Sequence, residues 1–212
     1  MQEILDKYSL LKSQNVPRET LLDFEKFVLM LIEVDKKINI ISKKTSIENE
    51  IRERHIIDSA QVIDLIDINS DILTDIGSGG GMPGIIISIM TKNIKNSLKI
   101  NLYEKSHHKS VFLKRVSRDL KLNTTVIQKN IFEEKNLESG TIIARAFKPM
   151  PIVLELVYRN FSKYKNLVLF MGKNGERILE DSLKNWDFDF EKKESITSKD
   201  SFLLNIKNIK KK

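Results

Sequence analysis

A glycine-rich segment, Asp75–Gly84 (DIGSGGGMPG), has the composition of a loop that holds a ligand against protein backbone. Five of the eight glycines of the chain lie within it. Because glycine lacks a Cβ, Gly77, Gly79 and Gly81 can take positive φ and let a ligand approach closely. A helix that begins near Pro83 presents free N–H groups to an anionic group of that ligand. A tight turn that binds nothing is the alternative, and so many glycines in one turn disfavour it.

The same segment fits two kinds of nucleotide ligand. Gly79, Gly81 and Gly84 satisfy the G-x-G-x-x-G fingerprint of dinucleotide-binding folds, in which a pyrophosphate rests on the helix N-terminus. Asp75 favours a cationic ligand instead, held directly or through water, because a carboxylate at the end of a strand repels a pyrophosphate. The pattern therefore favours S-adenosylmethionine as the cofactor, with NAD as the alternative.

Two further charged residues lie at the ends of apolar runs. Glu104 can accept both ribose hydroxyls of an adenosine ligand, whichever of the two cofactors binds. A solvated charge paired with Lys105 is its alternative. Arg145 ends the run IIAR, where an arginine is costly to bury unless it is paired or bound to an anion. We predict Arg145 as the catalytic residue, and a structural ion pair with Asp75 or Glu104 is the alternative.

The apolar runs predict the elements that position these residues. Short runs at 72–76, 98–104, 124–128, 141–146 and 166–171 alternate with amphipathic stretches at 83–92, 107–121, 149–161 and 175–184. This alternation is typical of a parallel sheet covered by helices on both faces. The segment 188–208 reads as two strands joined by a polar turn, which predicts an antiparallel hairpin at the edge of the sheet. We expect the lysine-rich end of the chain, Lys207 and Lys210–Lys212, to be disordered.

The first part of the chain reads as helical. Apolar residues within 24–38 recur at helical spacing and predict one amphipathic helix. Thr20 and Thr45 are each followed three residues later by an acidic side chain, which predicts two helix N-caps. The second helix is expected to run, with a break, to about Ile66. We therefore predict a helical subdomain at 1–68 and an α/β domain at 69–212.

The composition excludes several classes of protein. No apolar run is long enough to span a bilayer, and the charged N-terminus is unlike a signal peptide. The chain has no cysteine and three histidines, which argues against disulfides and metal sites. A net charge of +7 favours an anionic partner such as nucleic acid, although a lysine-rich composition throughout the chain is the alternative cause. We expect a cytoplasmic monomer without a metal ion.

Four segments together resemble the RsmG (GidB) family, the bacterial methyltransferases that modify N7 of a guanine in 16S ribosomal RNA. They are ERHIIDS (53–59), DIGSGGGMPG (75–84), IARAF (143–147) and LFMGKNG (169–175). The resemblance implies a Rossmann-like class I methyltransferase fold: a mostly parallel seven-stranded sheet flanked by helices, an antiparallel edge hairpin and an N-terminal helical extension. It also implies S-adenosylmethionine as the cofactor and 16S rRNA or the small ribosomal subunit as the partner.

The resemblance also assigns roles to residues of the cofactor site. Gly77 and Met82 match loop positions that contact S-adenosylmethionine, and Glu104 matches the acid that binds the ribose. Ile131 and Phe132 match the pair that brackets the adenine, and Arg145 matches an arginine of the cofactor and substrate pocket.

This sequence departs from the family pattern at two places. The family's W-N-x-x-x-N-L-T segment has Val34 in place of the tryptophan and lacks the threonine. The lysine of its LKG segment is Met171 here, and Lys173 stands two residues later. Both departures concern contact with RNA more than binding of the cofactor.

Methyl transfer to guanine N7 needs no general base, because N7 carries a free lone pair at neutral pH. Alignment and electrostatics then supply the catalysis. N7 edges face the deep, narrow groove of A-form RNA, so we expect an unpaired guanine as the target, contacted by Arg54, His55, Lys148 and Lys173. A packed core histidine is the alternative for His55. The alternatives for the whole protein are a methyltransferase of another substrate, an RNA-binding protein that retains a cofactor pocket, and an NAD-dependent oxidoreductase.

Overall fold

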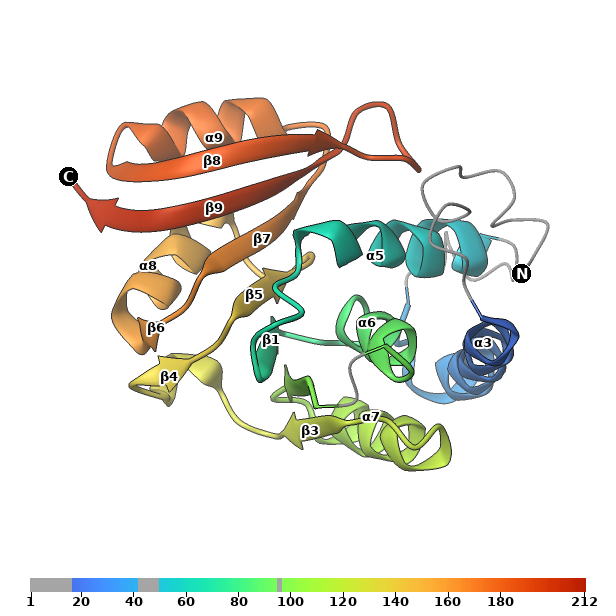
Figure 1. Cartoon of the computed structure of the whole chain (residues 1–212). Coiled ribbons are helices and arrows are strands. Elements are labelled where there is room, and N and C mark those ends of the chain that lie inside the picture. The colour runs from blue at the N-terminus through green and yellow to red at the C-terminus, as the bar shows by residue number, and fades with distance from the viewer. Residues whose placement is uncertain (1–16, 42–49, 95–96) are drawn as a thin grey trace.

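The structure, a computed structural model, describes residues 17–41, 50–94 and 97–212. A seven-stranded sheet with the order β3-β2-β1-β5-β7-β9-β8 forms its centre (Figure 1). The parallel strands are β1 (Ile72–Ile76), β2 (Lys99–Tyr103), β3 (Thr124–Ile127), β5 (Thr141–Ala144) and β7 (Asn166–Met171). The antiparallel edge hairpin consists of β8 (Trp186–Glu194) and β9 (Phe202–Lys211). The predicted mostly parallel sheet with an edge hairpin is confirmed.

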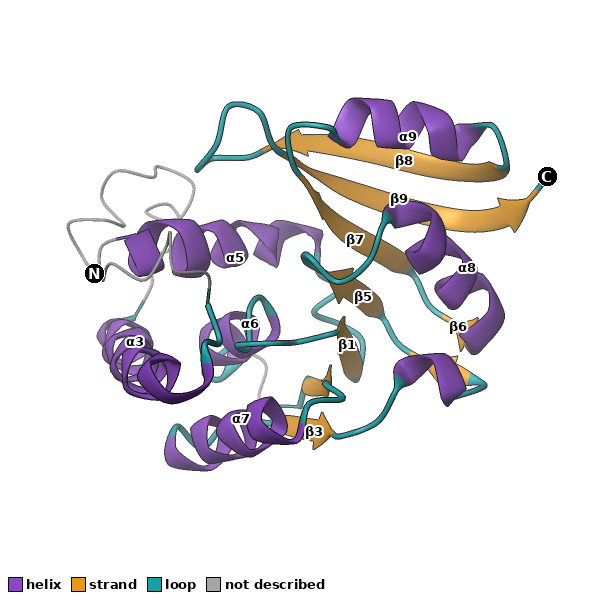
Figure 2. Cartoon of the chain, turned by 180° about the vertical axis from the view of Figure 1, so that it is seen from behind, coloured by secondary structure: helices purple, strands orange, loops and turns teal. Residues whose placement is uncertain are grey.

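Helices cover both faces of this sheet. On one face lie α3 (Arg18–Ile38), α6 (Gly84–Thr91), α7 (His107–Asp119) and a helical segment made of η2 (Ile51–Ile57), α5 (Asp58–Ala60) and η3 (Gln61–Leu65). On the other face lie α8 (Met150–Asn160) and α9 (Gly175–Leu183). The views from the front and from behind agree on this division (Figures 1 and 2). No helix of the described residues is long and apolar enough to cross a membrane.

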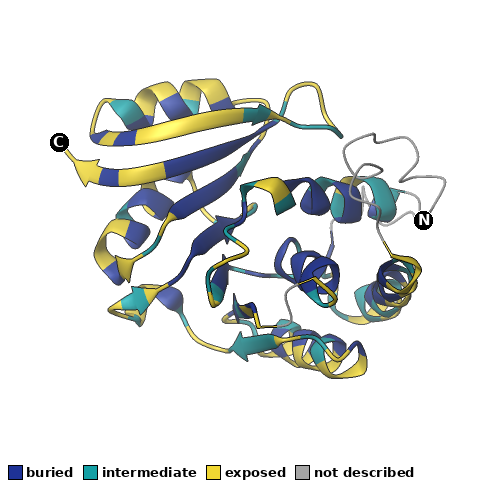
Figure 3. Cartoon of the chain, viewed as in Figure 1, coloured by how far each residue is buried: buried dark blue, intermediate teal, exposed yellow. Residues whose placement is uncertain are grey.

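The core is divided in two by the sheet, and consecutive strand residues point to opposite sides of it. In β5, Ile142 packs on the side of α8 and Ile143 on the side of α6. In β7, Leu167 packs on the side of α8 and Val168 on the side of α6. The central strands are buried along most of their length (Figure 3), which explains why their sequences read as continuous apolar runs.

The N-terminal helices share one apolar core with the sheet. Phe24, Phe27 and Leu31 of α3 are buried in the same cluster as residues of α6 and α7. Ion pairs reinforce the contact between helices, since Arg52 Nη2 lies 2.6 Å from Glu25 Oε2. The boundary at residue 68, between η3 and β1, stays a prediction.

Several details differ from the sequence-based expectations. Thr20 is wrong as an N-cap, because α3 begins at Arg18 after Pro17 and the Thr20 hydroxyl is buried within the first turn. The lysine-rich end of the chain is not disordered, since β9 extends to Lys211 and is paired with β8. Two short strands that pair in parallel, β4 (Leu137–Glu138) and β6 (Phe161–Lys163), were not predicted. Thr45 lies outside the described residues.

Candidate functional site

A cavity of about 630 Å³ opens where β1, β2, β3 and β5 end. Strand order reverses at β1, which has β2 on one side and β5 on the other, and such a switch point is where open α/β sheets bind ligands. Most of the predicted site residues line this cavity: His55, Gly77, Gly79, Met82, Glu104, Ile131, Phe132, Arg145 and Lys148. Asp75, Gly81, Arg54 and Lys173 are not among the residues that line it.

The glycines of the loop after β1 serve different purposes. Gly77, with φ +71°, packs so closely on the ring of Phe147 that any Cβ would clash with it. Gly79, with φ +54°, lines the cavity, and a Cβ there would meet only the Gly77 carbonyl oxygen, at 3.7 Å. Gly81 faces Ile85 and Leu113 in the core. Gly77 and Gly81 therefore shape the loop, and Gly79 leaves room for a ligand beside the backbone.

Asp75 lies beneath the loop and holds it to the following helix. Its side chain is 1% exposed, and Oδ2 accepts a hydrogen bond of 3.0 Å from the N–H of Gly84, the first residue of α6. A carboxylate at a helix N-terminus is favoured by the helix dipole. Burial nevertheless dominates and raises the pKa of Asp75 to about 7. The position of Asp75 supports a role in shaping the loop rather than direct contact with a ligand.

We expect Asp75→Asn to change how stability depends on pH. The pKa of Asp75 is about 7 in the folded chain against 3.8 ordinarily, so folding takes up a proton between these values. The contribution of Asp75 to the free energy of unfolding should therefore fall as the pH rises through this window, by roughly 2 kcal/mol or more. Asparagine still offers an oxygen to the Gly84 N–H but does not titrate. His55, whose pKa is lowered to about 4, changes stability in the opposite sense over the same range, so the measured quantity is the difference in unfolding free energy between wild type and variant. Denaturant unfolding at about pH 4.5 and about pH 7.5 should show this difference fall as the pH rises. Parallel pH profiles for the two proteins would contradict it.

Glu104 lies at the end of β2 with its carboxylate organised by backbone. Oε2 accepts from the N–H of Gly79 at 2.9 Å and Oε1 accepts from the N–H of Ser106 at 2.7 Å. The carboxylate is thus held by these N–H groups rather than by Lys105. A carboxylate has about four lone-pair sites, so two remain for a pair of hydroxyl groups. This arrangement fits a ribose diol against the glycine loop.

Apolar side chains form another part of the cavity lining. Ile131 and Phe132 belong to the short helix η4 (Ile131–Glu133), and Phe132 stacks on Phe147 with ring centroids 6.0 Å apart. Asn160, at the end of α8, holds this segment from behind. Its Nδ2 donates to the carbonyl of Glu134 at 2.6 Å and lies 3.2 Å from the carbonyls of both Ile131 and Phe132. Sequence reasoning did not find Asn160, since nothing in the pattern of α8 distinguishes it.

We expect Asn160→Asp to weaken cofactor binding more than turnover. A carboxylate cannot donate to the three carbonyls and repels them, so the segment with Ile131 and Phe132 should lose its fixed position. The KM for S-adenosylmethionine should rise about tenfold with kcat little changed, since a net hydrogen bond is worth roughly 1 kcal/mol. Ser162→Ala is the control, because Ser162 also donates to a nearby backbone carbonyl, that of Leu137. Equal effects of the two variants on KM would contradict a positioning role.

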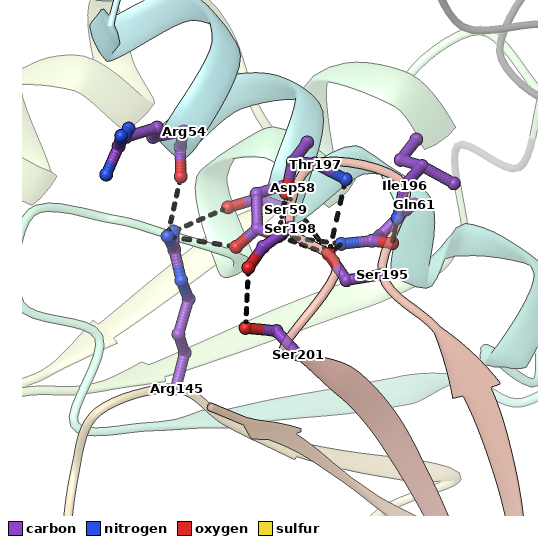
Figure 4. A network of polar contacts seen from close by, with 10 residues as sticks. All are labelled: Arg54, Asp58, Ser59, Gln61, Arg145, Ser195, Ile196, Thr197, Ser198 and Ser201. Atoms are coloured by element: carbon purple, nitrogen blue, oxygen red, sulfur yellow. Dashed lines mark hydrogen bonds and ion pairs between the residues drawn. The ribbon is translucent and has the colours of Figure 1, made fainter. Parts of the chain in front are cut away.

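Arg145 lies at the end of β5 and is bound by the helical segment above the sheet (Figure 4). Nη2 lies 3.0 Å from Asp58 Oδ2 and donates to the carbonyl of Arg54 at 2.7 Å. Nη1 donates to the hydroxyl of Ser59 at 3.1 Å. The structural pair foreseen for Arg145 therefore exists, but its partner is Asp58 and not Asp75 or Glu104. Burial lowers the pKa of Arg145, and the nearby Asp58 opposes that effect.

The carbonyl of Arg54 reaches Arg145 because the helix is locally wide. Residues 51–57 form a π-helix, and the N–H of Asp58 bonds to the carbonyl of Glu53, five residues back, rather than to that of Arg54. A π-helical turn inside a helix is frequent at functional sites. The motif ERHIIDS thus supplies three of its atoms, from Arg54, Asp58 and Ser59, to one guanidinium.

A loop between β8 and β9 completes this network from the other side. Oδ1 of Asp58 accepts from the hydroxyl of Thr197 at 2.7 Å and from Nε2 of Gln61 at 2.7 Å. The hydroxyl of Ser195 lies 3.4 Å from the same oxygen (Figure 4). Asp58 therefore joins the end of β5, the helical segment and the loop 195–201.

A second cavity, of about 580 Å³, lies between this loop and the end of β7. It shares His55, Arg145 and Ala146 with the first cavity. Ala146 takes the left-handed conformation, with φ +50°. Burial lowers the pKa of His55 to about 4, helped by the charge of Arg145, so the imidazole is neutral at pH 7.

The four predicted RNA-contacting residues are dispersed. His55 lines both cavities, Arg54 lines the second and Lys148 lines the first. Lys173 follows Gly172 and is exposed outside both. Within residues 17–41, 50–94 and 97–212, no group of three or more histidine, aspartate or glutamate side chains is placed to hold a metal ion.

The sheet order, the glycine loop and the carboxylate after β2 define a Rossmann-like protein of the class that binds an adenosine cofactor beyond the strand ends. The sequence matches the family described as rRNA small subunit methyltransferase G (GidB) over residues 20–206. It is 70% identical over 212 residues to the ribosomal RNA small subunit methyltransferase G of Pelagibacter ubique, with 100% of both chains covered. It is 32% identical to that of Rickettsia felis, over 92% of this chain and 97% of the relative. The chain belongs to the rRNA small subunit methyltransferase G family.

Solved structures agree on the fold. A SAM-dependent methyltransferase from Aquifex aeolicus has a TM-score of 0.54 at 14% identity, over 75% of this chain and 92% of that chain. A mutant of MtNAS in complex with S-adenosylmethionine has a TM-score of 0.56 at 13% identity, over 88% of this chain and 75% of that chain. The predicted methyltransferase fold, the rRNA methyltransferase activity and S-adenosylmethionine as the cofactor are confirmed. Family membership excludes the NAD-dependent oxidoreductase.

Proposed function

We propose that this protein transfers a methyl group from S-adenosylmethionine to N7 of an unpaired guanine in 16S ribosomal RNA. The observation that carries the proposal is the junction of two cavities at Arg145. One cavity has the carboxylate and apolar residues that suit an adenosine ligand, and the other opens toward a polar loop. Because the two cavities share lining residues, a methyl donor in one and an acceptor base in the other can lie next to each other, as methyl transfer requires.

The residues present fit S-adenosylmethionine at the first cavity. Glu104 would accept hydrogen bonds from the ribose hydroxyls, Ile131 and Phe132 would enclose the adenine, and Gly79 would let the ligand approach the backbone. Gly77 and Met82 also face this space, whereas Asp75 and Gly81 fix the loop from below it. When bound, the cofactor supplies an electrophilic methyl group on a positively charged sulfur.

The chain has to align guanine N7 with that methyl group. The N7 lone pair forms the new C–N bond as the carbon–sulfur bond breaks, so positive charge moves to the base and no proton is transferred. Arg145 is restrained on three sides, which suits a group that orients the acceptor. The Asp58 carboxylate offsets its charge, and His55 is neutral because its pKa is about 4. The wall between the cavities therefore adds little positive charge beside the base.

Four lysines are among the residues that line the first cavity, and their charge suits the phosphates of an RNA strand. Lys105, Lys109 and Lys148 line it beside Lys129, which is paired with Glu134 at 2.9 Å. We assign Lys148, together with Arg54 and Lys173 nearer the second cavity, to contact with the RNA backbone. We also propose that the protein acts as a monomer in the cytoplasm, where small ribosomal subunits assemble.

The proposal is tested with purified protein, S-adenosylmethionine and small ribosomal subunits from a bacterial strain that lacks its own member of the family. We expect one 7-methylguanine in 16S rRNA, mapped by cleavage at the modified base. Naked 16S rRNA and assembly intermediates serve as parallel substrates. Methylation of a different atom, or of another substrate only, would overturn the proposal. Cofactor binding without methylation of any of the three substrates would favour the RNA-binding alternative.

We expect Arg145→Ala to lower kcat about 100-fold while the chain still folds, because the acceptor loses its fixed partner. Asp58 loses its charge partner, so the free energy of unfolding should fall by about 1–3 kcal/mol. Arg115→Ala is the control, since Arg115 pairs with Glu33 at 3.1 Å on the surface. A folded Arg145→Ala protein with wild-type kcat would show that the arginine serves stability alone.

A further inference from the structure

The second cavity has the size and chemistry of a pocket for a flat polar molecule. Its volume of about 580 Å³ falls within the range of small-molecule sites, roughly 300–1,000 Å³. Phe170 and Phe202 form part of its wall, and the hydroxyl groups of the loop 195–201 form another part. The Arg145 guanidinium lies 5.6 Å from the centroid of the Phe170 ring. Aromatic surface with a few placed polar groups is what a purine base needs.

The hydroxyl groups of the loop have two different sets of partners (Figure 4). Ser195 and Thr197 are directed to Asp58 and so belong to the network that holds Arg145. Ser198 and Ser201 also line the cavity, and Ser201 donates to Ser198 over 3.0 Å. In this pair Ser201 keeps both lone pairs of its oxygen and Ser198 keeps one, so the pair can accept hydrogen bonds from adjacent N–H groups.

Arg145 also lines the second cavity and has N–H groups that are not used among the described residues. A guanidinium has five N–H groups. In Arg145, three of them are directed to Asp58, Ser59 and the carbonyl of Arg54. The remaining N–H groups can donate to a carbonyl oxygen in the cavity. Guanine has one at C6, next to N7, and its N1–H and 2-amino donors lie on the side of the base away from N7.

We propose that the second cavity is the guanine pocket and that Ser198 and Ser201 determine its specificity by accepting from N1–H and the 2-amino group. This inference rests on the proposed function. N7 has to face the first cavity, which the second cavity meets only at His55, Arg145 and Ala146 among the described lining residues. The opposite edge of the base then faces the loop, because Ser198 and Ser201 line only the second cavity. Adenine, which lacks both N–H donors at this edge, leaves the serine oxygens unpaired.

The test compares RNA that carries guanine with RNA that carries inosine at the target position, since inosine lacks only the 2-amino group. The wild type should prefer guanine over inosine about tenfold in kcat/KM, the worth of one hydrogen bond. The Ser198→Ala/Ser201→Ala double variant should lose this preference. It loses both hydrogen bonds to the base, so it should methylate guanine about a hundredfold less efficiently and bind S-adenosylmethionine with unchanged Kd.

The matched control is Lys199→Ala/Asp200→Ala, two exposed residues of the same loop that do not line the cavity and whose removal leaves the net charge unchanged. It should keep the guanine preference. If the wild type methylates guanine N7 and both double variants keep the same preference, the serines do not read the base and the inference fails alone. If the wild type methylates no guanine N7 in 16S rRNA, the proposed function fails with it. Should the double serine variant unfold, Ser198→Ala and Ser201→Ala are measured singly; one of them should reduce the preference, and an unchanged ratio in both would overturn the inference.

Discussion

The ion pair between Arg145 and Asp58 is the interaction on which the arrangement of this site depends. It joins the end of β5, the helical segment before β1 and the loop between the edge strands, three parts of the chain that are distant in sequence. The pair is largely buried, and such pairs contribute less to stability than their charge suggests because desolvation offsets the attraction. The main effect of the ion pair here is to fix the position of the Arg145 side chain. A guanidinium held by a carboxylate, a hydroxyl and a carbonyl is restricted to one orientation, and it lines both cavities.

The two carboxylates at the ends of β1 and β2 show how the cofactor side is organised. Each accepts hydrogen bonds from backbone N–H groups of the glycine loop or the segment that follows β2. Asp75 is buried beneath the loop and does not line the cavity, whereas Glu104 also faces the cavity. A loop rich in glycine has little conformational preference of its own, so it needs such anchors to keep one shape. The acids thus fix the backbone that then meets the ligand.

Much of this could be predicted from the sequence, because parallel strands buried on both faces leave continuous apolar runs and because ligand loops follow such strands. Glu104 and Arg145 were found for that reason. The partner of Arg145 could not be found, since Asp58 lies 87 positions away in the sequence and only the fold brings the two side chains together. Asn160 and the serines of the loop 195–201 were missed for a related reason. Their roles come from which carbonyls and cavities the fold brings beside them, and single polar residues carry no periodic signal.

The left-handed backbone at Ala146 has a consequence for the way the site is assembled. In an extended strand, residues 145 and 147 would point to the same side of the sheet. The turn at Ala146 separates them, so that Arg145 reaches the helical segment while Phe147 packs on Gly77 and Phe132. An alanine in this conformation costs roughly 1 kcal/mol. That strain is met when the chain folds, so Arg145 and Phe147 are already directed to different neighbours before any ligand binds.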